Sequence, residues 1–165
     1  MDIEIRPMRL DERVEVTRIF HDVWHETQAQ LQDPRKAKLR DSAFFRRRVE
    51  MAEVKTLVAA ASGGLLGFVR WSPGNLHSLF VRKAHRGLGI GEKLCSVAIR
   101  ANSAVGADPM VLDCVDGNWA ARRFYERLGW QVTESVESKD ETEEGQILTR
   151  YWLMVRPGSA HPSPK

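Results

Sequence analysis

The chain has 165 residues, of which 42% are hydrophobic and 28% are charged, and these values are typical of one globular domain and exclude disorder of the whole chain. The formal net charge is +3, which suits a small anionic ligand as well as nucleic acid. Cys95 and Cys114 form no Cys-x-x-Cys pair, so neither a disulfide framework nor a cysteine-rich zinc site is indicated. No apolar stretch approaches the roughly 20 residues of a membrane span and no signal peptide is recognisable, so we expect a cytoplasmic protein.

The first half of the chain alternates between strand patterns and helical patterns. Residues 3–5 alternate apolar and charged side chains, and Val16, Ile19 and Val23 recur at the spacing of one helix face. The expected elements, in chain order, are a strand ending near Arg9, a helix from an N-cap at Asp11 to about Gln30 that Pro34 closes, a helix over about 42–52, a hairpin of strands 56–61 and 65–71, and a strand over 76–81.

The second half predicts a strand and helix unit followed by two final strands. A helix over 90–101, a strand over 110–115 and a helix over 119–128 come first, and Gly129 stands where a C-terminal glycine cap belongs. Strands over 130–136 and 147–155 follow, separated by a turn that contains most of the acidic stretch 134–144. This order predicts a mixed α/β fold.

A glycine-rich segment, Arg86-Gly87-Leu88-Gly89-Ile90-Gly91, lies between an expected strand and an expected helix. Glycines at such a place let the backbone approach a ligand closely, and the free N–H groups of a helix start attract phosphate oxygens. It is not a Walker A loop, because Gly-Lys-Ser/Thr is absent, and Glu92 and Leu94 stand where a dinucleotide fingerprint would need glycine. By itself the segment is also compatible with a flexible turn.

A second motif, Asn118-x-x-Ala121-x-x-Phe124-Tyr125-x-x-x-Gly129-Trp130, follows the next strand. With Arg86-x-x-Gly89-x-Gly91 and the strand Leu79-Phe80-Val81, it resembles the GNAT superfamily of acetyl-CoA-dependent N-acetyltransferases, although Lys83 stands where many members have proline. The resemblance implies an α/β GNAT fold, with a mixed, strongly twisted sheet of about seven strands flanked by about four helices. We expect one GNAT domain over residues 1–156 and a C-terminal tail over 157–165.

The resemblance also implies acetyl-CoA as cosubstrate. The pyrophosphate would lie on the glycine segment, near the basic residues Arg82, Lys83 and His85, and the pantetheine arm would follow the strand before it. Asn118 would contact that arm, or cap the helix at Trp119, or do both. The cofactor-binding residues that the resemblance implies are Leu79, Phe80, Val81, Arg86, Gly87, Leu88, Gly89, Ile90, Gly91 and Asn118.

Tyr125 matches the position of the general-acid tyrosine of the family. A tyrosine with a pKa of about 10 gives its proton uphill to a thiolate with a pKa of about 8.5, so hydrogen-bond donation alone is an alternative, as is a purely structural aromatic. His77 is the candidate base, because arylalkylamine N-acetyltransferases of this superfamily have histidine at this strand position and because strand alternation would place it on one face with Leu79 and Val81. A structural histidine is the alternative for His77. Asp113, on the neighbouring strand, is a second candidate base and is also a candidate substrate-binding residue, and a water chain is a further alternative for the base.

Three other features have weaker chemical interpretations. His21-Asp22-Val23-Trp24-His25 approximates a helical zinc motif, but aspartate replaces the glutamate and no third ligand stands out, so no metal is expected. Trp24 is either a wall of the acceptor site, as the resemblance implies, or a core aromatic. Cys114 as an acyl-carrying nucleophile has no adjacent base, and a buried thiol is favoured. Arg46-Arg47-Arg48 is interpreted as a solvated helix face.

The predicted function is acetyl transfer from acetyl-CoA to a primary amine by direct attack. The acceptor is left open between a small amine, an amino acid derivative, a protein N-terminus and an aminoacylated RNA. The acidic stretch 134–144 would attract a cationic acceptor, or it is only a solvated turn. A non-catalytic acyl-CoA-binding module is the main alternative, and nucleic-acid binding is a less favoured one. We expect no membrane partner, and a homodimer is left open.

Overall fold

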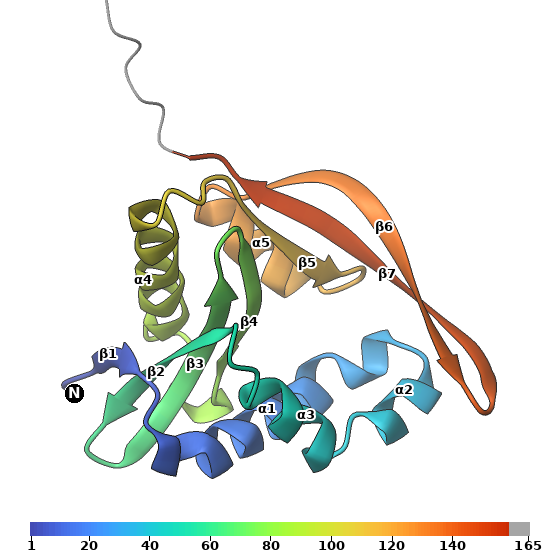
Figure 1. Cartoon of the computed structure of the whole chain (residues 1–165), viewed down its shortest axis with the longest axis horizontal. Coiled ribbons are helices and arrows are strands. Elements are labelled where there is room, and N and C mark those ends of the chain that lie inside the picture. The colour runs from blue at the N-terminus through green and yellow to red at the C-terminus, as the bar shows by residue number, and fades with distance from the viewer. Residues whose placement is uncertain (159–165) are drawn as a thin grey trace, which may run out of the picture.

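One seven-stranded sheet forms the centre of the molecule, with its strands in the order β1-β2-β3-β4-β5-β7-β6 (Figure 1). The computed structural model describes residues 1–158, so the predicted tail over 157–165 lies outside the described residues except for its first two. Every neighbouring pair of strands is antiparallel except β4 with β5. The strands are β1 (Glu4–Pro7), β2 (Lys55–Ala61), β3 (Gly64–Ser72), β4 (Asn75–Val81), β5 (Met110–Val115), β6 (Gln131–Thr142) and β7 (Gly145–Arg156).

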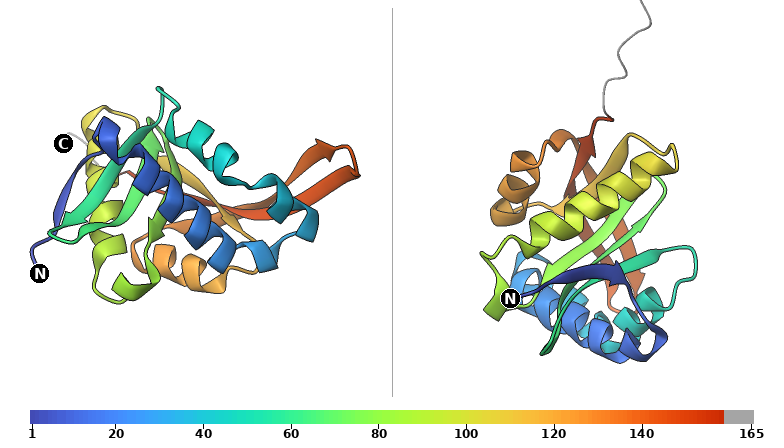
Figure 2. Two further views of the ribbon diagram at one scale, coloured as in Figure 1. Left: turned by 90° about the horizontal axis from the view of Figure 1, so that it is seen from below. Right: turned by 90° about the vertical axis from the view of Figure 1, so that its left-hand side faces the viewer.

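Helices cover both faces of the sheet, as Figure 2 shows for α1 and α4. Phe68 and Val69 are consecutive on β3 and therefore point to opposite faces. Phe68 packs in a cluster with α1 and α3, and Val69 packs in a second cluster with α4 and α5. Among residues 1–158, no helix combines the length and the apolar character that a membrane crossing requires. The helices are α1 (Arg13–Thr27), α2 (Pro34–Leu39), α3 (Ser42–Val49), α4 (Ile90–Ala104) and α5 (Trp119–Arg127).

The two central strands, β4 and β5, separate almost as soon as they meet. Their parallel pairing consists of a single registered pair, Asn75 with Val111. Beyond that pair each strand continues without the other, so the β4 edge that faces β5 keeps main-chain groups that no strand pairs. The fold therefore opens a gap in the middle of its own sheet.

The structure confirms the predicted mixed α/β fold and corrects some boundaries near the N-terminus. Asp11 does not cap α1, which begins one residue after Glu12, and α1 ends at Thr27 instead of near Gln30. Pro34 does not merely close a helix but opens the unpredicted α2, in which the Asp33 carboxylate accepts a hydrogen bond from the Arg35 N–H at 2.9 Å. Proline suits the first turn of a helix, because the N–H that it lacks would have no partner there.

The last two strands are longer than predicted. The acidic stretch is not a turn: β6 runs to Thr142 and β7 starts at Gly145, so only two residues separate them. The hairpin extends beyond the body of the sheet and its far part lies beside α2 (Figures 1 and 2). Polar side chains on both of its faces are compatible with an antiparallel ribbon in water, although they remove the alternation that reveals a strand in the sequence.

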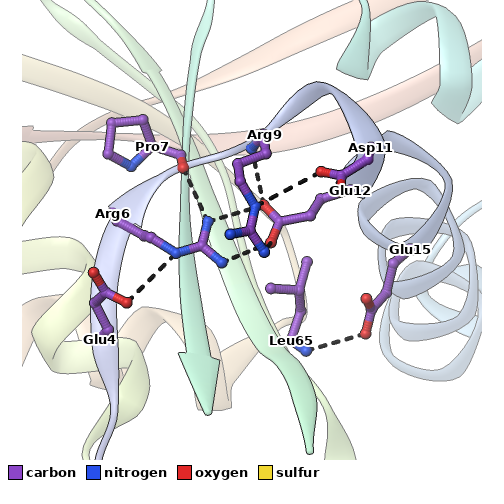
Figure 3. Close-up of polar contacts among 8 residues, drawn as sticks. All are labelled: Glu4, Arg6, Pro7, Arg9, Asp11, Glu12, Glu15 and Leu65. Carbon is purple, nitrogen blue, oxygen red and sulfur yellow. Dashed lines mark hydrogen bonds and ion pairs between the residues drawn. The ribbon is translucent and has the colours of Figure 1, made fainter. Parts of the chain in front are cut away.

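A compact ion-pair network fixes β1 to the start of α1 (Figure 3). The Arg6 guanidinium donates to both carboxylate oxygens of Glu12, at 3.0 and 2.6 Å, and the Arg9 N–H donates to the same carboxylate at 2.8 Å. The Glu12 side chain is only 8% exposed. These hydrogen bonds stabilise the charged carboxylate and lower the pKa of Glu12 to about 2.

Glu12→Gln is therefore expected to lower the free energy of unfolding at pH 7 by about 2 kcal/mol, because it leaves two arginines with a partly buried neutral amide. A carboxylate whose pKa is lowered on folding stabilises the native state above its unfolded pKa, near 4.5, and that stabilisation disappears as the pH falls toward 2. Chemical denaturation at pH 7 and pH 2.5 checks this, with Glu4→Gln as the control, since Glu4 is 71% exposed. Equal stability of Glu12→Gln and wild type at pH 7 would rule out this role.

Candidate active site

The gap between β4 and β5 is the floor of the main cleft, which has a volume of about 1020 Å³. The C-terminal part of α1, α2, α3 and α5 provide its walls, and the glycine segment before α4 lies at one end. Most of the predicted site residues, from elements far apart in the sequence, line this one cleft. They are Trp24, His77, Leu79, Phe80, Val81, Arg86, Gly87, Gly89, Ile90, Gly91, Asp113, Asn118 and Tyr125.

The glycine segment turns the chain from β4 into α4. Gly87 and Gly89 have φ angles of +78° and +77°, in the left-handed region that favours glycine, and Gly89 is the N-cap of α4. The first N–H groups of α4 have no partner within the helix. Because this end of α4 lines the cleft, these groups can donate hydrogen bonds to an anion there. Gly91 has a second reason to be glycine, because a Cβ there would come within 3.3 Å of the Phe124 ring of α5.

The predicted basic environment of this segment is only partly present. Arg86 lines the cleft, and its guanidinium donates to Glu26 of α1 at 2.9 Å and to the carbonyl oxygen of Val81 at 3.2 Å. Arg82 instead donates hydrogen bonds to the Glu15 carboxylate and to the carbonyl oxygen of Leu65, and it does not line the cleft. Leu88 is 55% exposed and also lies outside the lining, so its predicted contact with a cofactor has no support in its position.

His77 lies at an irregularity of β4. Ser78 pairs with Arg70 and Leu76 pairs with Trp71, so a register shift leaves His77 as an extra residue, and strict alternation with Leu79 does not hold through it. Its Nε2 lies 2.7 Å from the Ser72 hydroxyl oxygen. Burial and the positive charges of Arg70 and Arg48 lower the pKa of His77, whereas Asp113 across the gap opposes that shift. The ring is therefore neutral at pH 7, as a general base requires.

Tyr125, on α5, faces the cleft from within the hydrophobic cluster of α4. It is 8% exposed and its ring packs edge-on against Trp130, with 5.8 Å between the centroids. Burial raises the pKa of Tyr125 well above its usual value, so the hydroxyl stays protonated at physiological pH. The Asn118 side chain accepts from the Ala121 N–H at 3.3 Å, which confirms the predicted cap of α5.

The other sequence hypotheses have structural outcomes as well. Burial raises the pKa of Cys114 to about 12, so this thiol is not a reactive nucleophile at neutral pH. His25 is bonded to the Arg40 carbonyl oxygen at 2.6 Å, and residues 1–158 contain no cluster of three or more metal-binding side chains. Trp24 is only 6% exposed and packs among α1 and α3, yet it also contacts the cleft.

A basic wall of the cleft was missed in the sequence. Lys36, Arg40, Arg48 and Arg70 line it from α2, α3 and β3, whereas no residue of the acidic stretch 134–144 does. Asp140 from that stretch is instead paired with Lys36 at 3.5 Å and with Arg40 at 3.8 Å. The expectation that the hairpin acids attract a cationic acceptor is therefore without support in their position, since none of them lines the cleft and Asp140 is paired with two of its cations.

Comparison with known proteins agrees with this geometry. Residues 16–130, which contain the glycine segment, His77 and Tyr125, match the model of the acetyltransferase (GNAT) family. The chain belongs to the GNAT family. Several solved structures with a similar fold are named as GCN5-related N-acetyltransferases or as members of the GNAT family.

Two curated GNAT relatives and two solved structures illustrate the similarity. The chain is 34% identical over 87 residues to an uncharacterized N-acetyltransferase of Methanocaldococcus jannaschii, covering 52% of this chain and 56% of the relative. It is 28% identical over 120 residues to an L-methionine sulfoximine/L-methionine sulfone acetyltransferase of Pseudomonas aeruginosa, covering 67% of this chain and 66% of the relative. The matches thus span between about half and two thirds of these relatives.

The two solved structures show that the fold is shared along nearly the whole chain. A GCN5-related N-acetyltransferase from Rhodopseudomonas palustris superposes with a TM-score of 0.75 at 18% identity, covering 95% of this chain and 96% of that one. The yncA protein of Salmonella typhimurium, solved with its cofactor acetyl-CoA, has a TM-score of 0.69 at 23% identity, with 100% and 99% covered. At these identities the comparison supports the fold alone.

Gly89→Val is expected to raise the dissociation constant of acetyl-CoA by at least about tenfold, because a β-branched residue resists the left-handed φ that presents the start of α4. Isothermal titration calorimetry measures the constant. Gly63→Val, in the exposed turn between β2 and β3, is the matched control, since a Cβ there meets nothing within 4 Å. An unchanged affinity in a folded Gly89→Val protein would remove the glycine segment from the binding site.

Proposed function

We propose that this protein transfers the acetyl group of acetyl-CoA to a primary amine by direct attack. The observation that carries the proposal is the separation of β4 from β5 after Asn75 and Val111, because the glycine segment, His77 and Tyr125 all line the cleft that this separation opens. Acetyl-CoA is a cosubstrate in this proposal and no step requires a metal. We place the reaction in the cytoplasm, and nucleic acid is not an expected partner.

The residues of the cleft fit acetyl-CoA in three ways. The start of α4 offers N–H groups to the pyrophosphate, and the free edge of β4 over Leu79–Val81 offers main-chain groups to the pantetheine amides. An N–H of the same edge would stabilise the negative charge that develops on the thioester oxygen. Asn118 stands beside that path, at the start of α5.

His77 is the proton acceptor of the proposed reaction, and Tyr125 is the hydrogen-bond donor to the leaving group. The amine attacks in its neutral form, and the neutral ring of His77 accepts, directly or through a water molecule, the proton that the amine nitrogen loses as the C–N bond forms. Asp113, whose pKa is raised by burial, lies across the gap and orients that amine. Tyr125 donates a hydrogen bond to the departing thiolate of coenzyme A and keeps its own proton, because burial raises its pKa well above its usual value, and the thiolate needs this donor only late in the reaction.

An amine panel with acetyl-CoA tests the proposal. Release of free thiol that depends on both the protein and an amine, together with an acetylated product in the mass spectrum, is the expected result. Binding of acetyl-CoA without transfer to any amine, in a panel of amino acids, polyamines, aromatic amines and peptide N-termini, would instead identify a non-catalytic acyl-CoA-binding module.

A further inference from the structure

The cleft has an uneven distribution of charge that the transfer chemistry does not use. Arg48 and Arg70 line the cleft near His77. His77 lies about 13 Å along β4 from the end of that strand, where the glycine segment starts. Among the described residues that line the cleft, only Asp113 and Glu92 are acidic, and Glu92 belongs to the first turn of α4. The wall opposite the cofactor end is therefore strongly cationic, and Asp113 is the one carboxylate that lines the cleft near it.

The cations of this wall differ in whether the protein already neutralises them. Lys36 and Arg40 share Asp140, at 3.5 and 3.8 Å. Arg48 and Arg70 form no ion pair with any carboxylate in residues 1–158, and burial and the positive charge of Arg48 lower the pKa of Arg70, whereas Glu53 opposes that shift. Two guanidinium groups thus have no carboxylate within ion-pair distance in the described part of the chain.

Arg70 is the buried member of this pair. It is 3% exposed, and its two terminal nitrogens donate to the Ser78 hydroxyl at 3.1 Å and to the Arg48 carbonyl oxygen at 2.8 Å. Its Nε is buried with no partner in residues 1–158. A buried charge without a counterion is costly, so this arrangement is the expected one for a site whose ligand brings the negative charge.

Arg48 is the exposed member and is held by stacking. Its guanidinium carbon lies 4.5 Å from the centre of the Phe44 ring, and the guanidinium carbon of Arg40 lies 4.1 Å from the same centre. Stacking on an aromatic ring orients a guanidinium group and leaves its N–H groups free to donate two parallel hydrogen bonds to a carboxylate in the guanidinium plane. The side chain of Arg48 is therefore positioned before any ligand binds.

We propose that the acceptor is a small amine that also has a carboxylate, and that Arg48, supported by Arg70, binds this carboxylate while the amino group points toward His77 and Asp113. The inference rests on the proposed acetyl transfer and specifies its substrate class. A small molecule is favoured over a polypeptide, because Lys36 donates to the Tyr151 hydroxyl at 3.0 Å and so joins the α2 wall to the β7 wall of the cleft.

The test compares each of the twenty L-amino acids with its methyl ester as acceptor, using acetyl-CoA and the full chain. Each ester keeps the side chain and the amine but lacks the negative charge. Its amine also loses its proton more easily, so chemical reactivity by itself favours the ester. We expect kcat/KM for at least one free amino acid to exceed that for its ester by about tenfold or more.

Arg48→Gln should reduce this ratio of acid to ester about tenfold, with the dissociation constant of acetyl-CoA and the melting temperature unchanged. Arg47→Gln is the matched control, because Arg47 is exposed on the same helix and does not line the cleft. Arg48→Lys keeps the positive charge but lacks the planar pair of N–H donors, so it should recover part of the ratio. Such a recovery would exclude a simple folding defect.

Two results would overturn the inference and leave acetyl transfer intact. One is that methyl esters, or peptide N-termini, are acetylated at least as efficiently as every free amino acid. The other is that Arg48→Gln and Arg47→Gln have the same ratio of acid to ester as wild type. If acetyl-CoA binds and no amine of any kind is acetylated, the proposed function itself fails, and the inference fails with it.

Discussion

Tyr125→Phe is expected to lower kcat by about 10²-fold and to change the KM for acetyl-CoA by less than about twofold. The hydroxyl is needed by a thiolate that forms only as the thioester breaks, so its loss raises the energy of the transition state and not that of the bound cosubstrate. The substitution removes one oxygen from a buried ring that packs against Trp130, so the packing of α5 remains. Steady-state kinetics of thiol release measure both constants.

The chain offers its own control for this experiment. Tyr151 is the only other tyrosine, and its hydroxyl accepts a hydrogen bond from Lys36 at 3.0 Å. Tyr151→Phe is expected to keep kcat within about threefold of wild type, since that hydroxyl takes no part in the proposed proton transfers. A kcat for Tyr125→Phe that equals wild type would make Tyr125 a structural aromatic of the α4 and α5 cluster.

His77→Gln is expected to lower kcat/KM at pH 8 by about 10²-fold and to change the shape of the pH profile. In wild type both His77 and the acceptor amine must be unprotonated, so log kcat/KM should fall with a slope near two below the pKa of His77. That pKa is lower than 6.5, because burial, Arg70 and Arg48 all oppose protonation of the ring. The variant should fall with a slope near one over the same range, because only the amine still titrates.

Measurement of kcat/KM between about pH 5 and pH 9, with an acceptor whose amine pKa is above about 8, separates the two slopes. Thermal melts at each pH show whether the protein stays folded over the range. If wild type and His77→Gln have parallel acid limbs, then His77 is not the base, and Asp113 or a water chain takes its place.

The sequence was sufficient to predict an element where that element buries one face, because its apolar residues then recur at a regular spacing. The stripes of α1 and α4 repeat at helical spacing because each helix buries one face on the sheet, so both helices were predicted from Val16, Ile19, Ile90 and Leu94. α2 has six residues and its one buried residue is Lys36, so no apolar period reveals it. The hairpin of β6 and β7 was predicted too short for a similar reason, since its outer part has polar residues on both faces.

The cofactor end of the site was predictable for a different reason from the acceptor end. The cofactor-end residues between Leu79 and Tyr125 belong to short sequence motifs that resemble a known family. The spacing within each motif is therefore enough to assign them to the site. The basic wall comes from three separate parts of the chain, and only the tertiary fold brings Arg40, Arg48 and Arg70 to one cleft, where Arg40 and Arg48 stack on the Phe44 ring. The arginine run before Glu50 is therefore not uniformly a solvated face, because Arg48 lines the cleft whereas Arg47 does not.

Direct attack, with no acetyl group held by the protein, is the central claim, and rapid-quench mass spectrometry with acetyl-CoA labelled with carbon-13 in the acetyl group tests it most directly. One labelled N-acetyl product should form for each thiol released, and the intact protein should gain no acetyl mass at any time, because the pKa of the Cys114 thiol is raised to about 12. A labelled acetyl group that appears on the protein and then passes to the amine would contradict this account, as would thiol release without an acetylated amine.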